Sequence, residues 1–392
     1  MKYTFVFVGR RKELAYLEEK YLEDRSNMIL IYGRRRIGKT ALVTEFVRNK
    51  RALYLLATQE EKSQVVKGFS QRASEYFKDS FLQDNPFSDW DSLFRYIIEK
   101  IKSSDSKIVL VFDEVTYLIE QDKSFLSLMQ KYYDLHLKNL NVMLILTGSL
   151  VNVVYNDILD YNSPLFGRRT GNIELSELRF PEIRNFFPDA DVNQLVKIYS
   201  VYGGVPYYLG LLGDGSGSIE KFLNRNNVFY TDVQFILSQE LRTPDKYFSI
   251  LKLIANGKNS ISEISSSMEV NSNELSPYLD KLISMKVISK EFPLTAKRRN
   301  NGVYRITSNY FNFYFRFVFE KTRLVETGNE TTLIRYVNDN MDMYISKVFE
   351  DICNDFILEF SERLLGAKVD EIGRWWGKNP RKDQGKEIEE IA

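Results

Sequence analysis

An apolar run, a glycine-rich octapeptide and an amphipathic segment follow one another near the start of this 392-residue chain. The apolar run is Met28–Tyr32, and Lys39–Arg48 repeats apolar side chains at helical spacing. The octapeptide consists of Gly33, Arg34, Arg35, Arg36, Ile37, Gly38, Lys39 and Thr40. It has the G-x-x-x-x-G-K-[ST] spacing of a phosphate-binding loop, which requires a strand before it and a helix after it. The pattern therefore predicts a nucleotide-binding α/β domain.

The residue types in the octapeptide suit a nucleoside triphosphate and a magnesium ion. Gly33 and Gly38 let the backbone curl so that successive amides point inward, and the following helix directs its positive end at the same phosphates. Lys39 reaches the β- and γ-phosphate oxygens, and the Thr40 hydroxyl is a ligand for Mg²⁺. We expect the whole octapeptide to contact ATP.

Three further apolar runs predict more strands of the same sheet. They are Ala52–Ala57, Lys107–Phe112 and Val142–Leu146. All four apolar runs, Met28–Tyr32 included, lack alternation between polar and apolar residues, as in strands buried on both faces of a parallel sheet. Strands that alternate with helices favour a doubly wound α/β fold, so we expect a P-loop NTPase sheet.

Polar residues follow two of these runs, at the sheet edge where ligands bind. We expect Asp113 to hold Mg²⁺ and Glu114 to orient and deprotonate the attacking water. Ser149 could hydrogen-bond the γ-phosphate or that water, or simply cap its strand. Arg168 could stabilise charge on the γ-phosphate, from the same chain or a neighbouring one; a solvated surface pair fits the sequence equally well.

Composition excludes several other kinds of site. One cysteine and one histidine leave no intrachain disulfide, no cysteine-based metal site and no multi-histidine zinc site. The net charge of +1 gives no overall attraction to nucleic acid or membrane. No apolar run is long enough to span a bilayer, and no signal peptide is recognised, so we expect no membrane association and a cytoplasmic location.

Beyond about residue 245 the sequence predicts three helices followed by two strands, the order of a winged helix-turn-helix. The helices are Tyr247–Ala255, Ile261–Met268 and Glu274–Met285, and the strands are Val287–Phe292 and Val303–Ile306. The loop between the strands carries Lys297, Arg298 and Arg299. Such a basic wing could contact a DNA backbone, but a solvated loop or a protein-packing role fits as well.

Four segments together resemble the archaeal ATPase family, in the STAND/AAA+ part of the P-loop NTPases. They are Phe7–Leu14, Tyr32–Thr40, Leu165–Thr170 and Tyr202–Tyr207, and the resemblance covers about Phe5 to Thr307. It implies an ATP-binding α/β domain, a helical lid and a winged helix. It also implies that Gly9 and Arg10 line the adenine side of the nucleotide, and that Pro206 packs near it from the lid.

The C-terminal part is similar to the PD-(D/E)XK nuclease-like domain often fused to these ATPases. The similarity lies in Tyr310–Phe319, Val369–Gly377 and Glu387–Ala392. Glu389 stands where that family has an aspartate, and no Glu-x-Lys follows it. The resemblance therefore implies an incomplete nuclease core.

These patterns predict four parts: an ATPase domain over 1–175, a lid over 176–244, a winged helix over 245–307 and an incomplete nuclease-like part over 308–392. The preferred function is an ATP-driven conformational switch that acts on DNA or on a protein partner, with assembly into oligomers left open. One alternative is an ATPase that gates a nuclease-like domain on nucleic acid, and another is a nucleotide-holding module with negligible turnover. The trigger and the target cannot be read from these residues.

Overall fold

The computed structural model describes residues 7–213, 219–241, 243–294, 302–376 and 388–391. The chain divides into two compact units, Met1–Ser176 and Glu177–Ala392. The first unit is an α/β layer structure, and the second is largely helical with two short hairpins.

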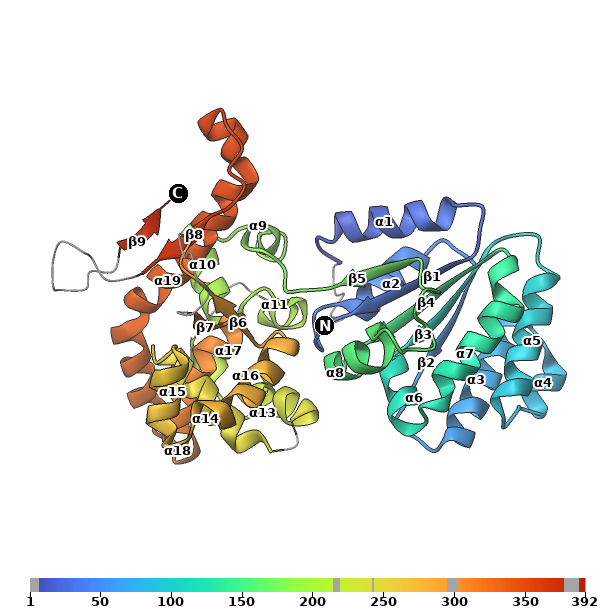
Figure 1. Cartoon of the computed structure of the whole chain (residues 1–392), viewed down its shortest axis with the longest axis horizontal. Coiled ribbons are helices and arrows are strands. Elements are labelled where there is room, and N and C mark those ends of the chain that lie inside the picture. Colours follow the sequence, from blue (N-terminus) through green and yellow to red (C-terminus); the bar gives the residue numbers. More distant parts are fainter. Residues whose placement is uncertain (1–6, 214–218, 242, 295–301, 377–387, 392) are drawn as a thin grey trace. The chain divides into compact units, whose positions relative to one another are not determined.

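A five-stranded parallel sheet forms the centre of the first unit (Figure 1). Its spatial order is β2-β3-β4-β1-β5, and each neighbouring pair is parallel. The strands are β1 (Asn27–Tyr32), β2 (Ala52–Leu56), β3 (Ile108–Asp113), β4 (Val142–Gly148) and β5 (Gly171–Glu174). Four of them correspond to predicted strands, whereas β5 was not predicted.

Helices cover both faces of this sheet. They are α1 (Arg11–Leu22), α2 (Lys39–Val47), α3 (Lys62–Phe77), α4 (Ser80–Asp84), α5 (Trp90–Lys102), α6 (Val115–Gln121), α7 (Ser124–Leu135) and α8 (Val151–Val153), with short η1 (Leu137–Asn139) and η2 (Val154–Leu159). Strand alternation decides which face each side chain meets. Ile29 and Ile31 pack on the side of α1 and α2, whereas Met28 and Leu30 pack on the side of α3, α5, α6 and α7. This arrangement confirms the predicted α/β fold.

The second unit contains helices α9 (Phe180–Ile183), α10 (Val192–Tyr202), α11 (Pro206–Leu212), α12 (Ile219–Leu223), α13 (Val228–Glu240), α14 (Pro244–Ala255), α15 (Ile261–Met268), α16 (Ser272–Ser284), α17 (Asn309–Phe313), α18 (Thr322–Glu326) and α19 (Glu330–Leu365), with η3 (Tyr314–Val318) and η4 (Phe319–Lys321). Its antiparallel hairpins are β6 (Ile288–Glu291) with β7 (Val303–Ile306), and β8 (Gly373–Trp375) with β9 (Ile388–Ile391). A winged helix requires three helices followed by two strands, and the chain has this order in α14, α15, α16, β6 and β7.

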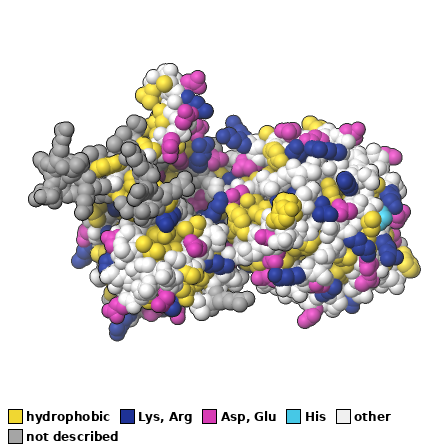
Figure 2. Space-filling model, in the orientation of Figure 1, with side chains coloured by type: hydrophobic (Ala, Val, Ile, Leu, Met, Phe, Trp, Pro, Cys, Tyr) yellow, Lys and Arg dark blue, Asp and Glu magenta, His cyan; other side chains and the backbone are white. Residues whose placement is uncertain are grey.

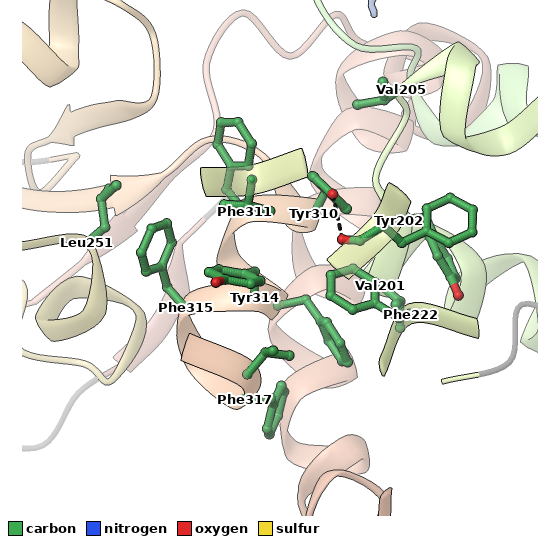
Figure 3. Packing of buried hydrophobic residues seen from close by; sticks show 14 of the residues in the cluster. Val201, Tyr202, Val205, Phe222, Leu251, Tyr310, Phe311, Tyr314, Phe315 and Phe317 are labelled. Carbon is green, nitrogen blue, oxygen red and sulfur yellow. Dashed lines mark hydrogen bonds between the residues drawn. The ribbon is translucent and has the colours of Figure 1, made fainter. Parts of the chain in front are cut away.

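Aromatic side chains of α17 and η3 fill the core of the second unit (Figure 3). The ring of Tyr310 packs against that of Tyr208 with centroids 4.3 Å apart, and its hydroxyl donates to the carbonyl of Phe229 at 2.7 Å. Burying such rings gives a large apolar contact, and the donated bond satisfies the one polar atom taken inside. The aromatic run of the sequence is therefore core packing.

Charged side chains of both signs are interspersed over the face of the protein drawn in Figure 2. None of the helices within the described residues combines the length and the apolar character needed to cross a bilayer.

Candidate active site

The octapeptide forms the turn between β1 and α2. Gly33 has φ 144°, and a Cβ built on it would lie 2.3 Å from the carbonyl oxygen of Leu175. Gly38 has φ 92° where it precedes α2. Both positions are in the region of φ that L side chains avoid, so glycine is required there. Arg36 also has a positive φ, 69°, which is uncommon for a residue with a side chain.

Lys39 is 4% exposed, and its ammonium group turns back into the loop. The Nζ atom donates to the carbonyls of Gly33 and Arg34, at 3.0 Å each, and lies 4.0 Å from Glu114 Oε1. A buried ammonium held by carbonyls and close to a carboxylate is a cation placed for an anionic ligand.

Asp113 ends β3 and is fully buried. It continues the alternation of Val109 and Val111, so its carboxylate lies on the α2 side of the sheet. The Oδ2 atom accepts a hydrogen bond from Thr40 Oγ1 at 3.0 Å and another from the hydroxyl of Tyr54, and Oδ1 accepts one from Thr147. Burial, followed by the nearby charge of Asp113, raises the pKa of Tyr54, which keeps this phenol a neutral donor.

Glu114 follows with φ 58°, a left-handed conformation that turns the chain sharply between β3 and α6. Its amide donates to Thr147 Oγ1 at 2.9 Å. Its carboxylate Oε2 accepts from the Ser149 hydroxyl at 2.6 Å and from the Ser149 amide at 3.1 Å. Because β4 lies between β1 and β3, the residues at its end bridge the loop and the acidic pair.

The Thr40 hydroxyl and the Asp113 carboxylate suit a hard divalent cation, since Mg²⁺ takes oxygen ligands. Across the described parts of the chain, no group of three or more acidic, histidine or cysteine side chains gathers as a metal site. This donor set fits Mg²⁺ held by one or two protein oxygens together with nucleotide phosphates and water, the usual arrangement for this ion.

Gly9 and Arg10 lie just before α1, with φ values of 72° and 58°. The Arg10 guanidinium is buried and donates to the carbonyl of Ile37 at 3.2 Å and to that of Ser176. Arg10 thus ties the N-terminal segment to the octapeptide backbone. Within the octapeptide, the Arg35 guanidinium lies 5.6 Å from the centre of the Tyr117 ring on α6.

Arg168 lies at the end of the sheet where the parallel strands begin, whereas the octapeptide lies where they end. Thr170, two residues later, donates its amide to the carbonyl of Met28, at the start of β1, whereas Gly33 follows the end of that strand. Met28 and Gly33 are five residues apart along β1, which corresponds to about 16 Å at the rise per residue of a strand. The Arg168 guanidinium instead pairs with Asp134 of α7, at 2.8 to 3.0 Å. Arg168 therefore lies near the start of β5, at the other end of the sheet from the octapeptide, and its role on the γ-phosphate stays a prediction.

Other predicted site residues lie outside the cluster around Lys39 and Asp113. Pro206 begins α11 in the second unit, so its role stays a prediction. Lys297, Arg298 and Arg299 fall outside the described residues. Glu389 lies on β9. Sequence reasoning missed Tyr54, because it sits inside an apolar run with no motif around it.

Comparisons with known proteins agree with this geometry. Residues 7–212 match the family described as an ATPase domain predominantly from Archaea, and residues 314–392 match a family of archaeal and bacterial proteins of unknown function. An uncharacterized protein of Methanocaldococcus jannaschii is 33% identical over 99% of this chain and 84% of its own length.

Two solved structures share the fold. The Walker-type ATPase of Pyrococcus abyssi has a TM-score of 0.60 at 23% identity, over 79% of this chain and 96% of that one. The ORC2 protein of Aeropyrum pernix, solved as ADPNP–ADP complexes, has a TM-score of 0.53 at 13% identity, over 81% and 94%. With the family match over more than half of its length, the chain belongs to the archaeal ATPase family.

Proposed function

We propose that this protein binds ATP with Mg²⁺ at Gly33–Thr40 and hydrolyses the bond between its β- and γ-phosphates, giving ADP and phosphate. One observation carries the proposal: a single hydrogen-bonded chain runs from Thr40 through Asp113, Thr147 and Glu114 to Ser149, with Lys39 beside it. The chain joins the residues that an ATPase needs for phosphate, metal and water, and they lie at the start of α2 and at or just after the ends of β3 and β4.

Each residue has a distinct task in this proposal. The loop amides and the Lys39 ammonium bind the phosphates; when ATP enters, its oxygens replace the carbonyl oxygens that Lys39 contacts in this structure. Thr40 and Asp113 hold the magnesium ion, which when bound neutralises charge on the phosphates. Glu114, fixed by Ser149, accepts a proton from the attacking water, while Arg10 keeps the loop backbone in place.

We further propose that nucleotide binding and release switch the arrangement of the four predicted parts, residues 1–175, 176–244, 245–307 and 308–392. A switch needs a ligand with different affinities for two arrangements, and Pro206 of the predicted lid would supply contacts made in only one of them. The effector would be DNA or protein, and the element order α14, α15, α16, β6 and β7 supports a winged-helix module that could meet either. Because Arg168 lies at the other end of the sheet from the octapeptide, it would act on the nucleotide of a neighbouring copy.

Phosphate release by the whole chain tests the proposal. We expect Mg²⁺-dependent release that EDTA stops and that Lys39→Ala lowers by at least about a hundredfold, since removing one preorganised stabilising group costs that order. Lys50→Ala is the matched control, because Lys50 lies just beyond the other end of α2 and pairs with Glu18. ATP binding that Lys39→Ala leaves unchanged would overturn the site. Tight ATP binding without release would favour the nucleotide-holding alternative.

A further inference from the structure

Asp113 accepts a hydrogen bond from Tyr54, a residue outside the phosphate-loop pattern. Tyr54 lies on β2, at the edge of the sheet, and pairs in register with Val111 of β3. Its hydroxyl donates to Asp113 Oδ2, the oxygen that also accepts from Thr40. The two donors reach this oxygen from different elements, β2 and the first turn of α2.

The three residues that donate hydrogen bonds to Asp113 would have different roles when the metal binds. Thr147 of β4 donates to Oδ1 and also accepts a hydrogen bond from the amide of Glu114, so it holds the turn after β3 in place. Thr40 is exposed and would exchange its bond to Asp113 for the metal. Tyr54 is the remaining donor on Oδ2. Its ring packs with the α2-side core and fixes the direction from which its hydroxyl approaches.

From this geometry we propose that Tyr54 is a positioning residue for magnesium in the ATP complex, and this rests on the proposed function of the site. A carboxylate oxygen accepts two hydrogen bonds, so Tyr54 can keep one position of Oδ2 filled while the position held by Thr40 is released to the metal side. With Tyr54 in place the carboxylate does not rotate when Thr40 leaves. Without it, Oδ2 loses its last protein donor at the moment the metal arrives.

If Tyr54 positions the metal site, its loss should affect magnesium binding and not nucleotide binding. In the proposed complex the loop amides and Lys39 bind the phosphates, whereas the Tyr54 hydroxyl donates to the Asp113 carboxylate on the metal side. Loss of the Tyr54 hydroxyl should therefore weaken the response to Mg²⁺ and leave ATP affinity without metal unchanged. The expected size is about tenfold in the Mg²⁺ concentration for half-saturation, the order associated with one hydrogen bond to a charged group.

The experiment is a magnesium titration of the full chain with a fluorescent ATP analogue, read as binding and not as turnover. Tyr54→Phe removes only the hydroxyl, and Tyr76→Phe is the matched control because the buried hydroxyl of Tyr76 has no hydrogen-bond partner among the residues that the structure describes. We expect Tyr54→Phe to need about ten times more Mg²⁺ than wild type, with equal affinity in EDTA, and Tyr76→Phe to match wild type.

The outcomes separate this inference from the function on which it rests. If wild type binds the analogue with Mg²⁺ and Tyr54→Phe gives the same magnesium curve, Tyr54 does not position the metal site, while the proposed function stands. If Tyr54→Phe loses affinity equally with EDTA and with Mg²⁺, its role is general structure and the inference fails. If wild type shows no magnesium-dependent binding, both proposals fail.

Discussion

Replacing Glu114 with glutamine should stop hydrolysis and preserve ATP binding. Glutamine has the same shape, and its amide oxygen can accept the two bonds that Ser149 gives to Glu114 Oε2, at 2.6 and 3.1 Å. The side chain should thus stay where it is. What is lost is the ability to take a proton, which in general-base catalysis contributes 10²- to 10⁴-fold. At about 1.4 kcal/mol per factor of ten, the barrier should rise by roughly 3 to 5 kcal/mol.

Two measurements on the same preparation decide the matter. Single-turnover phosphate release, with protein in excess over ATP, reports the chemical step, and equilibrium titration with a fluorescent ATP analogue reports binding. We expect release to fall by at least about a hundredfold and binding to stay equal or to tighten, because a negative charge 4.0 Å from Lys39 is removed. Glu99→Gln on α5 is the control, since that side chain is exposed and pairs with Lys102. Release at the wild-type rate by Glu114→Gln would refute the assignment of the base.

Three further changes test other parts of the account. Gly33→Ala should abolish ATP binding and lower Tm, because its Cβ would lie 2.3 Å from the Leu175 carbonyl oxygen, whereas Gly68→Ala, with nothing within 4 Å, should do neither; equal melting curves and affinities would count against the loop geometry. Arg168→Ala should leave hydrolysis by the monomeric chain within about twofold of wild type, since Arg168 forms a part-exposed ion pair with Asp134 at the end of the sheet away from the octapeptide; a large loss in a preparation shown to be monomeric by sedimentation would contradict this prediction. If the wing contacts DNA, changing Lys297, Arg298 and Arg299 to serine should reduce the slope of log affinity against log salt by up to about three; an unaltered slope would remove these residues from the interface.

The sequence predicts those parts of the structure that depend on local pattern. The octapeptide, its flanking strand and helix and the paired Asp113 and Glu114 are recognisable because each needs fixed residue types at fixed spacing. Helix α15 and strand β7 have the predicted bounds, Ile261–Met268 and Val303–Ile306. Both have clear ends: a capping box formed by Ser260 and Glu263 begins α15.

What the sequence does not predict depends on tertiary arrangement. Strand β5 is short and begins at Gly171, so it lacks the apolar run that identifies the other strands. The position of β4 between β1 and β3 is a matter of strand order, which no local pattern encodes. The same is true of Arg168: β5 runs parallel to β1, so Arg168, just before β5, lies at the end of the sheet opposite the octapeptide. Tyr54 meets Asp113 only because β2 pairs with β3 in one register.

A crystal structure of the protein with Mg²⁺ and a non-hydrolysable ATP analogue tests the central claim most directly. We predict that the triphosphate accepts hydrogen bonds from the backbone amides of Gly33–Thr40. Lys39 Nζ should have moved from the carbonyls of Gly33 and Arg34 to the phosphate oxygens. The metal should lie between Thr40 and Asp113. A nucleotide bound elsewhere, with Lys39 still on those two carbonyls and Thr40 still bonded to Asp113, would contradict the account.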